Sequence, residues 1–246
     1  MDAGNGMTVK IATKAQQGPS AIGQSTWTGG LLLARALCAE APRHGDIDDC
    51  SSPHTAVAVD ADWSVVGRTC LELGCGTGLA GLAALSLECQ RCTFSDCSLA
   101  ALHDLRESLS LLPAKLQGRA SIRRHVWETD SPENFGKPLR HWSNADACND
   151  PTFCPCSLAD DDVYDCIIAA DVLYFEVQVE PLVHTLNRRL KDGGFALILV
   201  TVRTRTTATV RRFEAALSSA GFQVASIPCE VCGSIVWRLR RASICL

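Results

Sequence analysis

The chain has 246 residues, of which 47% are hydrophobic and 20% charged, and its formal net charge is −4. This length is enough for one large domain with a buried core, and the composition is typical of a soluble globular enzyme. No apolar run reaches the roughly 18 residues of a membrane-spanning helix, which excludes an integral membrane protein of that kind. The mild net charge gives no general attraction to nucleic acid, so we expect no nucleic-acid partner.

The first ten residues lack a basic start followed by an apolar core, and they therefore predict no secretory signal. The chain contains 14 cysteines, which in a long sequence without such a signal are expected to be reduced thiols rather than a disulfide framework. We accordingly expect a cytoplasmic monomer, with the nucleus as the alternative location.

Two cysteine pairs have the spacing of zinc ligands, Cys89 with Cys92 and Cys229 with Cys232. The first pair spans a predicted helix end and strand start, and the second lies in a predicted hairpin turn. Nothing in the pattern brings the two pairs together, so we expect no metal site.

Residues 1–22 are polar and predict a flexible lead-in, followed by a single domain over 23–246. The first half of this domain predicts a helix over 29–38 with Thr28 available as N-cap, a surface loop over 41–55, a strand over 68–73, a helix over 79–87, a strand over 92–95, a helix over 99–112 and a strand over 121–127.

The second half begins with a segment rich in Asp, Asn, Pro and Ser that predicts a long loop over 128–162. It continues with a strand over 164–170, a helix over 179–190 with a C-cap at 191–194, a strand over 195–202, a helix over 207–220 ended by Gly221, and a hairpin of strands over 222–227 and 234–239. Such alternation predicts an α/β fold with a seven-stranded, mostly parallel sheet covered on both faces and an antiparallel C-terminal hairpin.

An apolar strand leads into the glycine loop Gly74–Gly78 and then into a helix. Glycines let the backbone turn tightly and approach a ligand closely, because no Cβ stands in the way. In an open α/β sheet such a loop lies at the carboxyl ends of the strands, where ligands bind. The pattern predicts a nucleotide-binding loop, and Glu72 just before it could anchor a cationic group of the ligand.

The glycine loop alone leaves two cofactors open. Gly76, Gly78 and Gly81 also fit the dinucleotide fingerprint, and Asp96 follows at about the spacing of an acid that binds a ribose. However, Gly74 begins the turn before that fingerprint starts, and the carboxylate of Glu72 would repel a pyrophosphate. These two details favour S-adenosylmethionine over a nicotinamide cofactor.

A second motif, Asp171–Tyr174, follows the buried strand over 164–170. In a doubly wound sheet it would lie beside the glycine loop, with the Asp171 carboxylate at the mouth of the ligand site. A helix cap is the alternative role for this aspartate.

Five segments, in order along the chain, resemble the family-16 methyltransferases, a METTL-like seven-β-strand group that contains many protein-lysine methyltransferases. They are residues 23–27 (GQSTW), 71–79 (LELGCGTGL), 95–96 (SD), 126–127 (VW) and 164–174 (YDCIIAADVLY). The resemblance extends over roughly residues 20–240. It implies a Rossmann-like class I methyltransferase fold, S-adenosyl-L-methionine as cofactor, and a lysine-bearing protein as substrate.

The resemblance also implies a set of site residues. The cofactor-binding residues would be Trp27, Glu72, Gly74, Gly76, Asp96, Trp127 and Ala170, and the catalytic residues Asp171 and Tyr174. Glu72 and the two glycines would hold the methionyl end, Asp96 the ribose and Trp127 the adenine, while Trp27 would close the pocket. The chain departs from the family pattern at Thr28, at Glu128, and in the loops over 41–55 and 128–162.

A neutral lysine amine would be oriented by Asp171, and a low-dielectric site beside a positive sulfonium would lower the amine pKa. Tyr174 would add a hydrogen bond or an aromatic wall. Glu176 and Glu180 could make the entrance acidic, or could simply be acids at a solvated helix start.

Three alternatives stay open. One keeps methyl transfer but changes the acceptor to a small molecule or to an arginine or histidine side chain. Another is an NAD(P)-dependent oxidoreductase, for which we find no hydride-side apparatus. The third is a methyltransferase fold that serves only as a binding module, against which Asp171 and Tyr174 argue.

Overall fold

The computed structural model describes residues 28–40, 63–134, 155–201, 207–229 and 233–241. The predicted lead-in over 1–22, the predicted loop over 41–55, and Trp27 lie outside these ranges. Within them, no helix is both long enough and apolar enough to cross a membrane.

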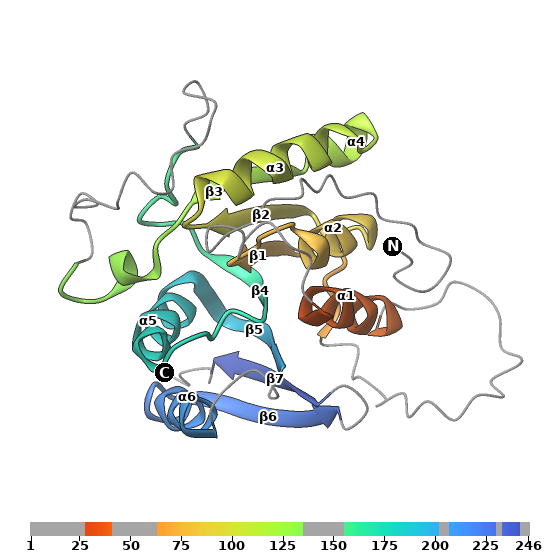
Figure 1. The fold of residues 1–246 in the computed structure, drawn as a ribbon. Helices are drawn as coiled ribbons and strands as arrows, with labels where there is room; N and C mark the ends of the chain where they lie inside the picture. Colours follow the sequence, from red (N-terminus) through yellow and green to blue (C-terminus); the bar gives the residue numbers. More distant parts are fainter. Residues whose placement is uncertain (1–27, 41–62, 135–154, 202–206, 230–232, 242–246) are drawn as a thin grey trace, which may run out of the picture.

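A seven-stranded sheet with the order β3-β2-β1-β4-β5-β7-β6 organises the fold, as Figure 1 shows. Its strands are β1 (Thr69–Leu73), β2 (Arg91–Asp96), β3 (Ala120–Arg124), β4 (Tyr164–Ala170), β5 (Leu190–Thr201), β6 (Phe222–Cys229) and β7 (Ser234–Arg241). Strands β1 to β5 pair in parallel, whereas β7 runs antiparallel to both β5 and β6. The predicted sheet and its terminal hairpin are therefore confirmed.

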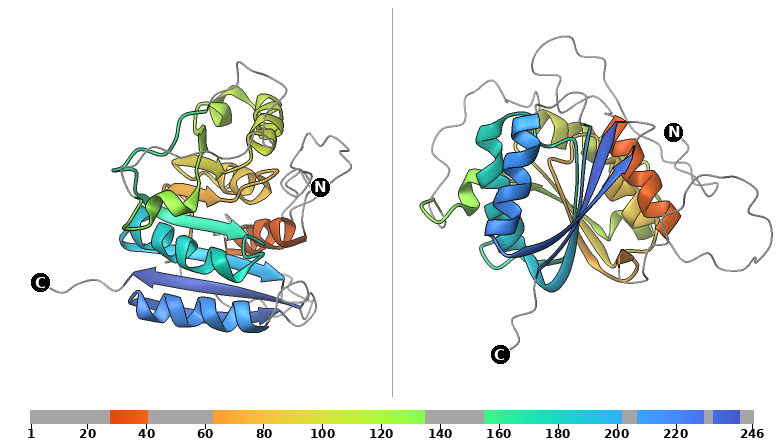
Figure 2. Two further views of the ribbon diagram at one scale, coloured as in Figure 1. Left: turned by 60° about the vertical axis from the view of Figure 1, so that its left-hand side comes forward. Right: turned by 90° about the horizontal axis from the view of Figure 1, so that it is seen from below.

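Helices cover both faces of the sheet (Figure 2). They are α1 (Thr28–Glu40), α2 (Leu79–Ser86), α3 (Leu99–Ser110), the short α4 (Ala114–Gln117), α5 (Val179–Arg189) and α6 (Thr207–Ser219). Apolar side chains of α1, α2 and α3 share one core cluster with one face of the central strands. Those of α5 and α6 form a second cluster on the opposite face.

Burial on both faces explains the composition of the central strands. The β4 sequence YDCIIAA has few polar residues, and Ile167 packs in one cluster while Ile168 packs in the other. A parallel strand between two layers of helices has no solvent-facing side, so its sequence is continuously apolar rather than alternating. The segment is thus a central strand of the sheet.

Three local predictions need correction. The third strand ends at Arg124, and Trp127 instead begins the 3-10 helix η3 (Trp127–Asp130). The predicted C-cap over 191–194 is wrong, because β5 already begins at Leu190, which is extended and pairs with Tyr164. Residues 191–194 lie within β5, where the pairing with β4 shifts register. Finally, the single turn of α4 has no counterpart in the prediction.

Gly81 and Gly30 allow a matched test of packing beneath the helices. A Cβ on Gly81 would overlap with Phe94 and would lie 2.5 Å from Oε2 of Glu72, whereas a Cβ on Gly30 would meet nothing closer than the Leu79 Cβ at 3.8 Å. We predict that Gly81→Ala lowers the free energy of unfolding by about 1–3 kcal/mol through overpacking. Gly30→Ala should leave it unchanged or raise it by up to about 1 kcal/mol, since alanine favours helix. Urea denaturation measures both changes, and equal effects of the two substitutions would contradict this account.

Candidate cofactor site at the carboxyl edge of the sheet

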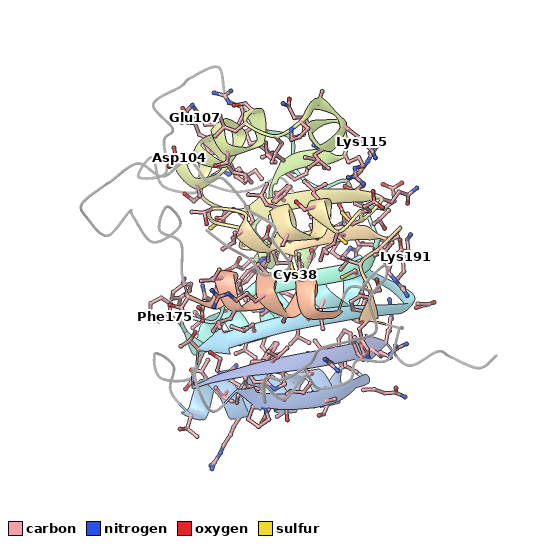
Figure 3. All side chains as sticks on the ribbon, turned by 90° about the vertical axis from the view of Figure 1, so that its right-hand side faces the viewer. Cys38, Asp104, Glu107, Lys115, Phe175 and Lys191 are labelled. Atoms are coloured by element: carbon pink, nitrogen blue, oxygen red, sulfur yellow. The ribbon has the colours of Figure 1, made fainter. Side chains whose placement is uncertain are left out.

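Three adjacent strands end at the candidate site. Leu73 of β1 pairs with Ser95 of β2 and with Ala169 of β4, so the segments that follow these strands lie side by side. Figure 3 shows Phe175, which comes one residue after the Asp171–Tyr174 motif, at the edge of the sheet opposite Lys191. The predicted convergence of the glycine loop, Asp96 and Asp171 is therefore present.

Gly74, Gly76 and Gly78 all have left-handed backbone conformations, with φ of 57°, 49° and 74°. Residues other than glycine rarely adopt this backbone conformation. The loop closes on itself and on β2, because the Gly78 N–H donates to the Cys75 carbonyl and the Cys75 N–H donates to the Ser95 carbonyl. The loop thus presents bare backbone at the edge where ligands of α/β sheets bind.

Asp96 links the glycine loop to the start of α3. Its Oδ2 accepts a hydrogen bond from the Gly76 N–H at 2.9 Å, and its Oδ1 accepts one from the N–H of Ser98, the N-cap of α3, also at 2.9 Å. Burial raises the pKa of Asp96, although these hydrogen bonds act in the opposite direction. Its two backbone partners fix the orientation of the carboxylate at the end of β2, and its predicted contact with the ribose stays a prediction.

Glu72 is directed beneath α2. Its Oε2 accepts a hydrogen bond from the Gly81 N–H at 3.0 Å, in the first turn of that helix, and the side chain is buried. Burial raises the pKa of Glu72 from the ordinary 4.5 to about 8. The geometry shows a carboxyl group that fixes the position of α2, and its predicted contact with the methionyl end of a cofactor stays a prediction.

Trp127 and Val172 lie next to the first glycine of the loop. A Cβ on Gly74 would come within 2.8 Å of Val172 Cγ1 and 3.5 Å of Trp127 Cζ2. Trp127 is half-buried and packs against the core cluster beneath α5 and α6. The aromatic ring therefore lies near the glycine loop and comes from η3 rather than from a strand, while its predicted contact with the adenine stays a prediction. Val172 belongs to the Asp171–Tyr174 motif, and its contact with Gly74 agrees with the predicted position of that motif beside the loop.

Asp171 is buried and occupies the left-handed region with φ of 54°, which aspartate tolerates better than most residues. Its Oδ2 accepts a hydrogen bond from the Gly29 N–H at the start of α1, at 3.0 Å. Its Oδ1 accepts from the Thr201 N–H at 2.8 Å, and the Thr201 hydroxyl is 3.1 Å from Oδ2. The carboxylate thus joins α1, β4 and β5 at the site, and neither Gly29 nor Thr201 was predicted to take part.

Tyr174 and Ala170 are half-buried on either side of this junction. The N–H groups of Tyr174 and Phe175 both donate to Gln178 Oε1, which sets the path of the chain into α5. Glu176 and Glu180, the predicted acidic entrance, both lie near Arg212 of α6, at 3.8 and 3.6 Å. This arginine offsets part of their negative charge.

The structure describes in full one of the two cysteine pairs that have the spacing of zinc ligands. Cys89 and Cys92 are buried thiols, and the part of the chain that the structure describes contains no group of three or more His, Cys, Asp or Glu side chains arranged to hold a metal ion. Cys232 lies outside that part.

The sheet order, the loop at the end of β1 and the acid at the end of β2 define the fold of the class I methyltransferases. Solved structures agree: the glycopeptide N-methyltransferase MtfA in complex with S-adenosyl-L-methionine is 14% identical, with a TM-score of 0.53, 72% of this chain covered and 83% of that chain. The fibrillarin pre-rRNA processing protein of Methanococcus jannaschii is 12% identical, with a TM-score of 0.52 and 73% and 69% covered. The CurJ carbon methyltransferase is 19% identical, with a TM-score of 0.51 and 73% and 50% covered.

Residues 155–219 match the family model described as lysine methyltransferase. This segment contains β4, the Asp171–Tyr174 motif, α5, β5 and all of α6. The match is with the same family that the sequence motifs resemble, and the glycine loop lies outside the matched residues. No curated protein sequence matches the chain.

The raised pKa of Glu72 predicts a pH-dependent stability. Between pH 4.5 and about 8 the folded chain keeps a proton on Glu72 that the unfolded chain releases. The free energy of unfolding should therefore fall as the pH rises through this interval, by on the order of a few kcal/mol. Glu72→Gln cannot ionise and still offers an oxygen to the Gly81 N–H, so its stability should depend less on pH. Urea denaturation at pH 5, 6.5 and 8 tests this, and equal slopes for the two proteins would contradict it.

Proposed function

We propose that the chain is an S-adenosyl-L-methionine-dependent methyltransferase that transfers a methyl group to lysine side chains of a protein. One observation carries the first half of this proposal: three left-handed glycines, the Asp96 carboxylate and the Asp171 motif meet at the carboxyl edge of a class I methyltransferase fold. The family match over 155–219 supports the second half.

The residues at the edge fit S-adenosyl-L-methionine, which supplies an electrophilic methyl group on a positively charged sulfur. Gly74 and Gly76 would hold its methionyl part through backbone groups, since their left-handed conformations exclude bulky side chains. Asp96 would accept hydrogen bonds from the ribose hydroxyls, and the Trp127 ring beside Gly74 would pack against the adenine. Glu72 would contribute indirectly by fixing α2 behind the loop.

Asp171 acts in this proposal through position rather than through direct proton transfer. Each carboxylate oxygen already accepts a hydrogen bond from a backbone N–H, and together these bonds fix the start of α1 and the end of β5. Methyl transfer depends chiefly on alignment of the amine with the methyl group. A rigid arrangement of the elements around the site therefore accounts for much of the rate of methyl transfer. Tyr174, two residues before Glu176, would face the incoming amine.

A small-molecule acceptor is the second candidate. The specific observation that favours it is the likeness to MtfA, a glycopeptide N-methyltransferase. The two candidates share the cofactor site and differ only in what approaches the methyl group.

The acceptor class can be tested with labelled cofactor. We predict that the full chain, incubated with S-adenosyl-L-methionine carrying a radioactive methyl group and with cell extract, labels protein, and that acid hydrolysis releases the label as methyl-lysine. A label recovered as methyl-arginine or methyl-histidine would change the acceptor residue. A label found only in the small-molecule fraction would contradict a protein substrate.

The role of Asp171 can be tested with Gly29. A methyl group on Gly29 would overlap with Oδ2 of Asp171, so Gly29→Ala should disturb the same junction without changing the carboxylate chemically. We predict that Gly29→Ala and Asp171→Asn both lower kcat, on the order of 10- to 100-fold, because misalignment alone has effects of this size. Gly30→Ala is the matched control and should retain activity. Normal activity of Gly29→Ala beside an inactive Asp171→Asn would instead favour direct contact of Asp171 with the amine.

A further inference from the structure

A buried ionic network lies on the α5 face of the sheet, and none of its three residues was assigned to the site described above. Asp130, the last residue of η3, accepts hydrogen bonds from Arg189 Nε at 3.0 Å and from its terminal nitrogen Nη2 at 2.7 Å. His125 Nε2 is 2.9 Å from the same carboxylate. The side chains of His125, Asp130 and Arg189 are at most 3% exposed.

The network is held in a single geometry. Two parallel hydrogen bonds from an arginine to a carboxylate fix both distance and orientation. The other terminal nitrogen of Arg189 donates to the carbonyl groups of Ala159 and Asp162. Burial alone would raise the pKa of Asp130, but His125 and Arg189 outweigh this effect and lower the pKa. The carboxylate is therefore ionised and fully engaged.

Trp127 lies between the two anchored ends of this segment. On one side, the His125 N–H donates to the backbone carbonyl of Asp96, whose side chain is the acid assigned to the ribose. On the other side, Asp130 is fixed by Arg189, the last residue of α5. Between them, the N–H and the hydroxyl of Thr129 both donate to the Val126 carbonyl, which closes a tight turn. The backbone on both sides of Trp127 is thus held by contacts made at both ends of η3.

We propose that Arg189, acting through Asp130 and His125, is a positioning residue that holds Trp127 against the glycine loop and so sets the affinity for the cofactor. Arg189 does not touch the loop itself, and its effect passes through η3. This inference rests on the proposed function, because it assigns Trp127 to the adenine side of that same cofactor site.

Arg119 offers a matched control for substitution of Arg189. Arg119 also donates from both terminal nitrogens, in this case to the carbonyl groups of Cys89 and Leu85 behind α2. The hydrogen bonds of Arg119 and Arg189 go to groups outside the glycine loop. Arg189→Lys and Arg119→Lys both remove a forked donor and keep the charge. Only Arg189→Lys is expected to change cofactor binding.

The experiment measures the Kd of S-adenosylhomocysteine by calorimetry for the full chain, below the melting temperature of each variant. We expect Arg189→Lys to raise Kd about tenfold and Arg119→Lys to leave it unchanged. Trp127→Leu should raise Kd as well, and adding Arg189→Lys to Trp127→Leu should then change Kd by less than about twofold, because the arginine acts through the tryptophan.

Several outcomes would overturn the inference. One is an unchanged Kd in Arg189→Lys, and another is an equal loss in Arg119→Lys. A third is the same change of Kd on Arg189→Lys with and without Trp127. If Arg189→Lys does not fold, the double variant Asp130→Leu/Arg189→Met removes both charges at once and should show the same raised Kd. Absence of binding by the unaltered chain would instead refute the proposed function.

Discussion

Three buried carboxyl groups hold the starts of three helices, and the geometry of the candidate site depends on them. Asp171 accepts from the Gly29 N–H at the start of α1, Glu72 from the Gly81 N–H in the first turn of α2, and Asp96 from the N–H of the N-cap of α3. The first N–H groups of a helix have no partner within the helix, and an oxygen of each carboxyl group supplies one. Each acid belongs to, or directly follows, one of the strands β1, β2 and β4, so the same contacts that join helices to sheet also shape its carboxyl edge.

Because these carboxyl oxygens already accept hydrogen bonds from the protein backbone, the acids have few acceptor positions left for a ligand. Glu72 is directed under α2, and both oxygens of Asp171 already have backbone partners. The groups that remain for recognition are the backbone of the glycine loop, the Trp127 ring, and the lone pairs of Asp96 that Gly76 and Ser98 do not use. Recognition at this edge is therefore achieved mainly by shape and by fixed backbone groups, which suits a reaction that depends on alignment rather than on proton transfer by the protein.

The sequence was most informative where a local rule determines the structure. A strand with no solvent-facing side has to be continuously apolar, which located β4, and glycines followed by an Ala/Leu-rich helix located the loop and α2. The contacts of Gly29, Thr201 and Arg189 could not be predicted, because each joins residues at least 30 positions apart and has no local signature. Trp127 was assigned to the cofactor only by resemblance, and its 3-10 turn follows from Thr129 and Asp130 rather than from apolar alternation.

Calorimetric titration of the full chain shows whether the carboxyl edge binds S-adenosyl-L-methionine. We expect saturable binding of S-adenosylhomocysteine with one site per chain, weakened when Asp96 is replaced by Asn, and no binding of a nicotinamide dinucleotide under the same conditions. Tight binding of the dinucleotide without binding of S-adenosylhomocysteine would refute an S-adenosyl-L-methionine site at this edge.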